Sequence, residues 1–270
     1  MKFLESLIFG FLTGLTELLP ISSAAHQQLL GTILNDDLID PVRNLFIHIA
    51  VLIAIYAETA HIRNSLSKAT QSNRKRHGNS KAIAEHQFLR NTTVPFLIVF
   101  FLISYIIPSG GNLLLVSFIL LLNGVLLFLP DRMLQGNKNS KVMTKTDSAL
   151  IGSFGALSAL PGFSRIGGIL FAASFRGADR KSAVNWALML SIPALYALIL
   201  KDLFAIFAGN SLPFWSNFFF YIITAVAAFI GCRAGLYALK RHIRRTGCAS
   251  YAFYCWGAAL FALILFLTIA

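Results

Sequence analysis

Long apolar runs separated by short polar stretches dominate this sequence of 270 residues. The hydrocarbon core of a bilayer is about 30 Å thick and takes about 20 helical residues to cross. Six runs approach that length, at about 45–60, 93–107, 113–130, 183–203, 214–238 and 250–269. The pattern therefore predicts an all-α polytopic membrane protein with about six full transmembrane helices.

Two more apolar stretches, at about 10–30 and 148–175, are broken by polar residues and proline. Pro20 interrupts the first, and Pro161-Gly162 interrupts the second. Proline lacks a backbone N–H and disfavours helix in the residue before it, so each helix should end near its proline. The short helix after the first break would be only about 12 Å long, which is too short to cross the bilayer. Each stretch therefore predicts a re-entrant helix hairpin.

The two broken stretches also mark an internal repeat. Each is followed by three predicted spans, so the halves at about 1–130 and 147–270 share one plan within a single membrane domain. Three crossings make the two halves opposite in orientation. A shift of 141 residues superposes three pairs, Gly14 on Gly155, Pro20 on Pro161 and Ser23 on Ser164. Broken segments in inverted halves predict a binding site near the bilayer midplane, where the two tips meet.

The net charge of +12 comes from basic residues between the apolar runs. Three basic stretches, at about 61–91, 131–146 and 240–247, predict cytoplasmic loops because such loops carry the excess of Lys and Arg. The acidic turn at 36–40 and the C-terminus then lie on the outer face. The basic residues do not form a surface interleaved with aromatic residues, which argues against nucleic acid as a partner.

Composition supports the assignment to membrane proteins. The chain is 56% hydrophobic and 13% charged, whereas soluble domains are about 25% charged. Its three cysteines, Cys232, Cys248 and Cys255, lie in or near apolar runs and lack the spacing of a metal site. We expect these cysteines to pack in the core rather than to form disulfides or bind metal.

Polar chemistry is concentrated at the first break. An ionisable group at membrane depth is costly and marks a functional site, so Glu17 is a candidate to bind Mg²⁺ or Ca²⁺, or to act as an acid or base. Ser22 or Ser23 is suited to cap the helix that follows, whose free N–H groups favour phosphate. His26 lies three residues after Ser23, near enough to activate a hydroxyl or a water molecule.

The second break contributes Ser164 and Arg165. A buried Arg offers a fork of donors that matches phosphate oxygens, and the two helix starts add backbone N–H groups. Where the tips meet, Arg165 would lie near Ser23, with Glu17 and His26 around them. This arrangement predicts a cradle for a phosphorylated head group. The alternative is a Glu17–Arg165 ion pair that only ties the two halves together.

At these residues the sequence resembles the undecaprenyl-pyrophosphate phosphatase family of the BacA type. The family's first motif, Glu-Gly-x-Thr-Glu-x-x-Pro-(Ile/Val)-Ser-Ser-Thr-Gly-His, is matched by Gly14, Thr16, Glu17, Pro20, Ile21, Ser22, Ser23 and His26. The second motif, Pro-Gly-x-Ser-Arg-Ser-Gly, is matched by Pro161, Gly162, Ser164, Arg165 and Gly167. His48 falls where many members carry His or Gln.

The resemblance implies a phosphatase that removes the terminal phosphate of undecaprenyl pyrophosphate and recycles the lipid carrier of the cell wall. It would act at the outer face of the bacterial cytoplasmic membrane, with the bilayer and a polyprenyl pyrophosphate as partners and a homodimer as a candidate assembly. Glu17, Ser23 and His26 would be catalytic, and Glu17 would be the ligand to Mg²⁺ or Ca²⁺. The substrate-binding residues would be Ser22, His48, Gly162, Ser164 and Arg165.

Several positions depart from the family pattern. Thr13 stands where the family has its first acidic residue, Ala24 and Ala25 replace Thr-Gly, and Ile166 replaces Ser. Loss of one carboxylate weakens divalent-metal binding, since hard cations depend on anionic oxygen ligands. A non-catalytic polyprenyl-phosphate flippase or transporter of the same fold is therefore the main alternative. An unrelated inverted-repeat transporter is a third hypothesis.

Overall fold

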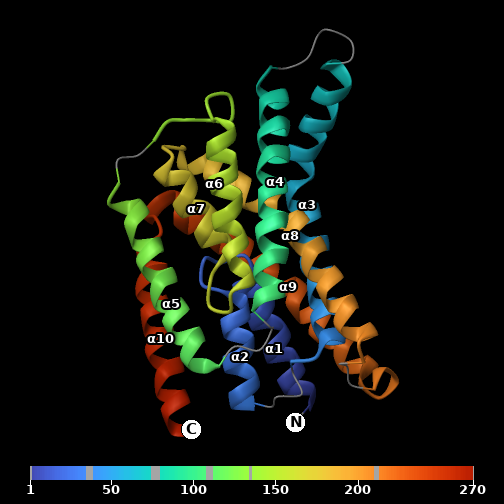
Figure 1. Ribbon diagram of the computed structural model, residues 1–270. Helices are drawn as coiled ribbons and strands as arrows, with labels where there is room; N and C mark the ends of the chain where they lie inside the picture. The colour runs from blue at the N-terminus through green and yellow to red at the C-terminus, as the bar shows by residue number, and fades with distance from the viewer. Residues whose placement is uncertain are drawn as a thin grey trace.

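The computed structural model describes residues 2–34, 39–73, 80–107, 112–133, 136–209 and 213–269. In these residues helices make up nearly all of the structure (Figure 1). The α-helices are α1 (Lys2–Glu17), α2 (Ser23–Leu34), α3 (Pro41–Asn73), α4 (Ser80–Ile106), α5 (Leu113–Phe128), α6 (Lys145–Ala156), α7 (Arg165–Phe175), α8 (Arg180–Phe207), α9 (Phe214–Thr246) and α10 (Ala249–Ile269). Two 3-10 turns, η2 (Leu129–Asp131) and η3 (Leu157–Ala159), follow α5 and α6.

Six of the described helices are long and apolar enough to cross a membrane, namely α3, α4, α5, α8, α9 and α10. They coincide with the six predicted apolar runs, so the prediction of an all-α polytopic membrane protein is confirmed. The helices α2, α6 and α7 have only 12, 12 and 11 residues. At 1.5 Å per residue each is at most about 18 Å long, which is too short to span the bilayer. Their re-entrant course stays a prediction.

The first break lies where Pro20 predicts it. Helix α1 ends at Glu17, and α2 begins at Ser23. Between them, Ser22 takes a left-handed backbone conformation with φ of 66°, and its Oγ accepts a hydrogen bond of 3.4 Å from the N–H of Ala25. Ser22 therefore turns the chain, and its side chain gives a partner to one of the free N–H groups at the start of α2. This is the capping role expected for Ser22 or Ser23.

The second break has the same design. Its turn includes Gly162, whose φ of 104° suits glycine, and whose Cβ, if present, would collide with Val116 O and Ile119. Ser164 caps α7 by accepting a hydrogen bond of 3.1 Å from the N–H of Gly167. Arg165 is consequently the first residue of α7, with its backbone beside the free N–H groups of the helix start.

An internal two-fold relation extends over the whole structure. A shift of 141 residues brings both ends of α2 onto α7 and the start of α3 onto the start of α8, each to within two residues, whereas α3 continues seven residues further than α8. Packing follows the same rule, because α1 packs on α9 whereas α6, its counterpart, packs on α4, the counterpart of α9. Figure 1 shows α5 and α10, which are also counterparts, side by side and antiparallel. This pairing supports the predicted inverted repeat.

Glycine permits the close approach of α1 to α9 and of α6 to α4. A Cβ on Gly14 would collide with the backbone of Ala228 in α9. A Cβ on Gly152 would collide in the same way with the carbonyl of Thr92 in α4. The two short helices are thus held against long helices by backbone contact, which fixes the position of the breaks that follow them.

Two of the predicted basic loops are largely helical. Residues 61–73 extend α3, residues 80–91 belong to α4, and α9 continues to Thr246. The expectation of loops at 61–91 and 240–247 was therefore wrong for these segments. They contain Lys, Arg, Gln and Ala, which favour helix, although the segments are too polar for the bilayer. Two parts of these predictions lie outside the described residues, namely Asp36 and Asp37 of the acidic turn and residues 74–76 of the first basic stretch.

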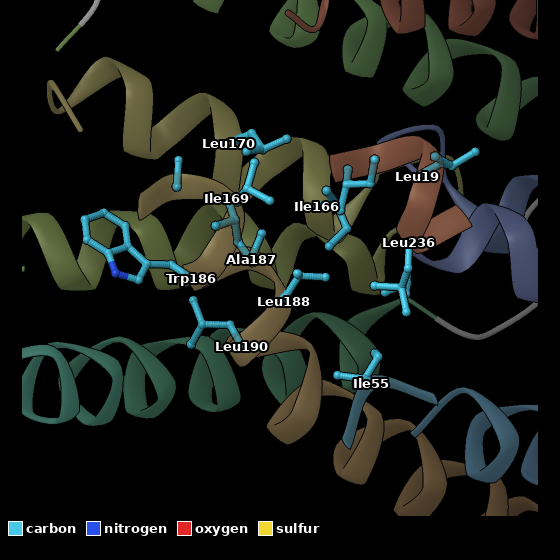
Figure 2. Close-up of a cluster of buried hydrophobic side chains, with 14 of the residues drawn as sticks. Leu19, Ile55, Ile166, Ile169, Leu170, Trp186, Ala187, Leu188, Leu190 and Leu236 are labelled. Atoms are coloured by element: carbon cyan, nitrogen blue, oxygen red, sulfur yellow. The ribbon is translucent and has the colours of Figure 1, made fainter. Parts of the chain in front are cut away.

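A buried apolar cluster surrounds the two breaks (Figure 2). It includes Leu19 from the first break and Ile166 from the second, together with Trp186 and Leu188 of α8. All four of these side chains are at most 8% exposed. The cysteines are also buried, as predicted, and each is a free thiol. Close packing of this kind holds the polar groups of the breaks in fixed positions.

Candidate active site

Glu17 and Arg165 form an ion pair at the point where the two breaks meet. Arg165 Nη2 lies 2.9 Å from Glu17 Oε1, and the two side chains are 5% and 6% exposed. The predicted approach of the last residue of α1 to the first residue of α7 is therefore confirmed. A lone charge is very costly to bury, so the pairing lowers the cost of placing these two side chains at this depth.

A second set of contacts orients the guanidinium of Arg165. Its Nε donates a hydrogen bond of 3.2 Å to Ser191 Oγ of α8. The Ser191 hydroxyl in turn donates to the carbonyl of Ala187, at 2.8 Å. Arg165 is thus held by α1 on one edge and by α8 on another, and Nη1 has no hydrogen bond to the described residues.

Asn123 of α5 connects the two breaks through one buried amide. Its Nδ2 donates to the carbonyl of Pro20 at 3.1 Å, and its Oδ1 accepts from the N–H of Ser164 at 3.0 Å. The Ser164 hydroxyl also donates to the carbonyl of Leu19, at 3.4 Å. Breaks of this kind leave backbone groups without helical partners. The Asn123 side chain supplies a partner to each tip and fixes one tip relative to the other.

A cavity of about 650 Å³ opens beside the ion pair. Its polar lining includes Thr16, Glu17, Ser22, Ser23, Gln27, Gln28, Thr32, Asn44, His48, Ser158, Ser164, Arg165, Lys201 and Asp202. This volume is in the usual range for ligand sites, and the share of polar groups is high for a space between transmembrane helices. The lining also includes Ile39, Pro41 and Leu113, which lie where α3 and α5 begin. The cavity therefore extends toward the membrane face opposite the basic stretches.

Counterpart residues of the two repeats line this one cavity. Ser23 and Ser164 are separated by the repeat shift of 141, and both line it. The counterpart of Glu17 in the second repeat is Ser158, and the counterpart of Arg165 in the first repeat is Ala24. All four residues line the cavity. Counterpart positions at the two breaks thus face one cavity, yet the Glu17–Arg165 ion pair is asymmetric. The carboxylate belongs to one half and the guanidinium to the other.

The structure places His48 in the cavity, as expected, and gives it an unexpected partner. His48 Nδ1 of α3 lies 2.6 Å from Asp202 Oδ2 of α8, and the two side chains are 8% and 11% exposed. Neither Asp202 nor the neighbouring Lys201 was singled out in the sequence. The signal was nevertheless present, because both are ionisable residues close to the end of an apolar run, and such residues mark functional sites.

His26 lies elsewhere, which contradicts its expected place beside Glu17 and Arg165. Its Nδ1 donates to the carbonyl of Ser22 at 2.7 Å, and its Nε2 lies 2.7 Å from the Tyr254 hydroxyl of α10. The ring also stacks on Tyr254. His26 lines a second, mainly apolar cavity of about 1260 Å³ on the other side of α2. Three residues leave Ser23 and His26 about 60° apart around α2, and the boundary between the two cavities falls between them, since Ser23 lines the first and His26 the second.

Of the other residues predicted to form the site, some line the polar cavity and some do not. Ser22, Ser23 and Ser164 line the polar cavity, whereas Gly162 acts through the turn conformation described above. Thr13 is fully buried away from the cavity lining, and its hydroxyl has no hydrogen-bond partner among the described residues. The family's first acidic position is therefore occupied here by a buried hydroxyl outside the cavity.

The donor set for a divalent cation is small. Within the described part of the chain, no group of three or more His, Cys, Asp or Glu side chains could hold a metal ion. Glu17 is the carboxylate beside Arg165, and the other carboxylate of the cavity, Asp202, is bonded to His48. Mg²⁺ often binds through one or two carboxylates together with substrate phosphates, so Glu17 fits a cation that arrives with a pyrophosphate.

Comparisons with known proteins agree with the motifs. A family model described as bacitracin resistance protein BacA matches residues 6–261. An undecaprenyl-diphosphatase of Methanococcus maripaludis is 30% identical over 265 residues, which cover 96% of this chain and 99% of that protein. Undecaprenyl-diphosphatase 3 of Bacillus cereus is 27% identical over 271 residues, which cover 98% of each chain.

Proposed function

The chain belongs to the family of the bacitracin resistance protein BacA, and on that premise we propose that it is an integral membrane undecaprenyl-diphosphatase. It hydrolyses undecaprenyl pyrophosphate to the monophosphate plus phosphate. The observation that carries the proposal is the buried Glu17–Arg165 pair, set between two helix starts in a polar cavity at membrane depth. The names of the related diphosphatases support this activity, and no comparable observation favours a non-catalytic flippase.

Arg165 is the residue that binds the pyrophosphate. Its guanidinium presents a planar fork of donors, and Arg–phosphate pairs of this kind are among the strongest hydrogen-bonded contacts in proteins. Ser191 already orients one edge of the group, so little side-chain freedom is lost when phosphate binds. The N–H groups at the starts of α2 and α7 add to the positive potential that favours an anion.

Glu17 holds the divalent cation in this proposal. Its carboxylate lines the cavity and would bind Mg²⁺ or Ca²⁺ there. The pyrophosphate would supply further oxygen ligands to the ion. When bound, the ion neutralises negative charge on the phosphates. Glu17 also keeps the guanidinium of Arg165 in place before substrate arrives, because the two side chains form an ion pair.

The hydroxyls of the cavity complete the proposed site. Ser23 is the candidate nucleophile among them, and its Oγ donates to the carbonyl of Thr13 at 3.4 Å, a long bond that it can exchange for a bond to phosphate. Ser22 and Ser164 are placed to bind phosphate oxygens around Arg165. His26 is not part of this arrangement, because its ring is bonded to Tyr254 in the second cavity.

The proposed location is the cytoplasmic membrane, with the cavity opening on the extracytoplasmic side. The basic stretches at 61–91, 131–146 and 240–247 support a cytoplasmic position for the opposite end of the bundle. A lipid pyrophosphate whose head group lies at the outer surface can then enter the cavity while its polyprenyl chain stays in the bilayer.

Phosphate release from undecaprenyl pyrophosphate tests this proposal. Purified protein in detergent, with Mg²⁺ or Ca²⁺, should release one phosphate per substrate. Glu17→Ala and Arg165→Ala should each lower kcat/KM by about 100-fold or more, since each removes a group that binds the charged phosphates. Glu5→Ala on α1 and Arg132→Ala after α5 are matched controls outside the cavity lining and should keep the wild-type rate. Absence of phosphate release with either cation would contradict the proposal.

A further inference from the structure

We propose that His48 is the general base of the hydrolysis and that Asp202 positions its imidazole. The proposal rests on the phosphatase function proposed above and goes beyond phosphate binding by His48. It stands on the placement of the pair, because His48 and Asp202 come from different long helices and meet in the cavity that also holds Arg165.

The hydrogen bond fixes the tautomer of His48. A carboxylate can only accept, so the Nδ1 atom that lies 2.6 Å from Asp202 Oδ2 carries the proton. In the neutral ring, Nε2 then has a free lone pair and can take a proton. The structure gives Nε2 no hydrogen-bond partner among the described residues. His48 is thus held in the form that a general base requires, as in other Asp–His pairs.

The surroundings of His48 suit a base that works beside an anionic substrate. The charged groups that line its cavity are Glu17 of α1, Arg165 of α7, and Lys201 and Asp202 of α8. Of the other helices packed on α3, α9 directs Arg233 and Lys240 to Glu58, almost three turns further along α3. Helix α4 contributes Phe100 and no charged side chain to the cavity lining. Asp202 is accordingly the carboxylate bonded to His48.

His48 accepts a proton in the proposed hydrolysis step. The oxygen of a water molecule attacks the terminal phosphorus of the pyrophosphate, and its proton passes to His48 Nε2. The bond between that phosphorus and the bridging oxygen breaks, and its electron pair leaves with undecaprenyl monophosphate. The Asp202 carboxylate stabilises the imidazolium that forms, which then gives its proton to solvent. If Ser23 is the nucleophile, His48 Nε2 accepts the proton of its hydroxyl as undecaprenyl monophosphate leaves, and a water molecule then hydrolyses the phosphoserine to release phosphate and restore the Ser23 hydroxyl.

His48 meets the requirements that His26 does not. Both nitrogens of His26 are hydrogen-bonded, one to Ser22 and the other to Tyr254, and its ring lines the second cavity. A base has to reach the proton that it removes, directly or through one water molecule. His48 lines the cavity of the ion pair, in which the proposed substrate binds.

The test compares His48→Gln and Asp202→Asn with wild type in phosphate release from undecaprenyl pyrophosphate across pH. His48→Gln should lower kcat by about 100-fold or more with little change in KM, and it should lose the low-pH limb of the kcat/KM profile. Asp202→Asn should lower kcat and move that limb, because it alters the group that orients the base. His61→Gln, on the same helix but outside the cavity lining, is the matched control and should keep both rate and profile.

Binding of a non-hydrolysable farnesyl methylenebisphosphonate checks that each variant keeps its site. Loss of kcat with retained binding supports the proposal. A folded His48→Gln protein with the wild-type rate and pH profile would overturn it while leaving the phosphatase function intact. If His48→Gln does not fold, Asp202→Asn decides, and an unchanged kcat and profile in that variant would overturn the proposal. A wild-type protein that releases no phosphate would instead refute the function itself.

Discussion

A carboxylate and a guanidinium buried together at membrane depth are stable only as a pair. Removing one partner from such a pair typically costs about 3–5 kcal/mol, because the remaining charge is left without compensation. A pyrophosphate can replace Glu17 as the partner of Arg165, since phosphate oxygens satisfy the same fork of donors. The Glu17–Arg165 contact of 2.9 Å therefore both stabilises the buried charges and holds the guanidinium in position for an anion.

Thr13 provides a prediction about stability that is separate from catalysis. Its side chain is fully buried, and its hydroxyl has no partner among the described residues. A buried unpaired hydroxyl costs about 1–3 kcal/mol, so the nearly isosteric Thr13→Val should raise the unfolding midpoint in detergent by a few degrees. Thr92→Val is the matched control, because the Thr92 hydroxyl donates to Phe88 O and its loss should not stabilise. A lower midpoint for Thr13→Val would contradict this account.

Single residues differ in how well the sequence predicts their place. Glu17 and Arg165 could be paired in advance because each adjoins a proline break, and the repeat sets the breaks against each other. The environment of His26 could not be predicted, because the side of α2 that faces each cavity depends on how α10 packs against it. Asp202 and Lys201 were overlooked because they lie near the end of an apolar run, where charged residues usually reach the membrane surface.

At the scale of elements, the short helices are held by specific end contacts as well as by packing. Helix α6 begins with a capping box in which the Thr144 hydroxyl accepts from Asp147 N–H and the Asp147 carboxylate accepts from Thr144 N–H. The same carboxylate accepts from Arg176, directly after α7. Asp147 thus links the start of one helix of the second hairpin to the end of the other.

This link predicts a dependence of stability on pH. Burial raises the pKa of Asp147, but the hydrogen bonds from Thr144 and Arg176 outweigh it and hold the pKa below its ordinary value. The stabilisation is then complete above the unfolded pKa of about 3.9 and is lost as pH falls through the lower folded value. At neutral pH, Asp147→Asn should lower the unfolding midpoint by about 2–4 °C.

Thermal unfolding of both proteins as a function of pH checks this prediction. The difference between wild type and Asp147→Asn should be constant from neutral pH down to about 5 and should shrink below about 4. Asp179→Asn, which alters the N-cap of α8 where Ser182 N–H donates to Asp179, is a matched control for loss of a capping carboxylate. A gap between wild type and Asp147→Asn that stays unchanged in acid would show that the carboxylate charge contributes little.

At the scale of the whole molecule, two similar halves form one site. In its ion pair, the first half supplies the carboxylate of Glu17 and the second half supplies the guanidinium of Arg165. The order of helices and the position of both breaks could be predicted from the prolines and the apolar runs. The helical extension of α3 and α4 beyond the expected spans could not, because charge density identifies a segment as polar without distinguishing helix from loop. Which counterpart residues line the cavity depends on packing across the two-fold axis.

Thiol labelling tests the orientation of the molecule. The native cysteines are buried, and burial raises the pKa of Cys248, outside the spans, to about 12, so the background should be low. A membrane-impermeant maleimide applied to spheroplasts should label Ile39→Cys at the cavity mouth, and Lys68→Cys on α3 only after permeabilisation. Wild-type protein is the control. The reverse pattern would place the cavity mouth on the cytoplasmic side.

The amide of Asn123 has a consequence for the path of the products. Its donor end serves Pro20 and its acceptor end serves Ser164, so moving one repeat against the other would break both bonds and leave buried groups unpaired. The Asn123 hydrogen bonds therefore hold the two tips together, and we expect substrate and products to use the same opening of the cavity, near Ile39 and Leu113. In the proposed orientation, the phosphate cleaved from the carrier leaves on the extracytoplasmic side, and the cell has to recover it by a separate uptake system.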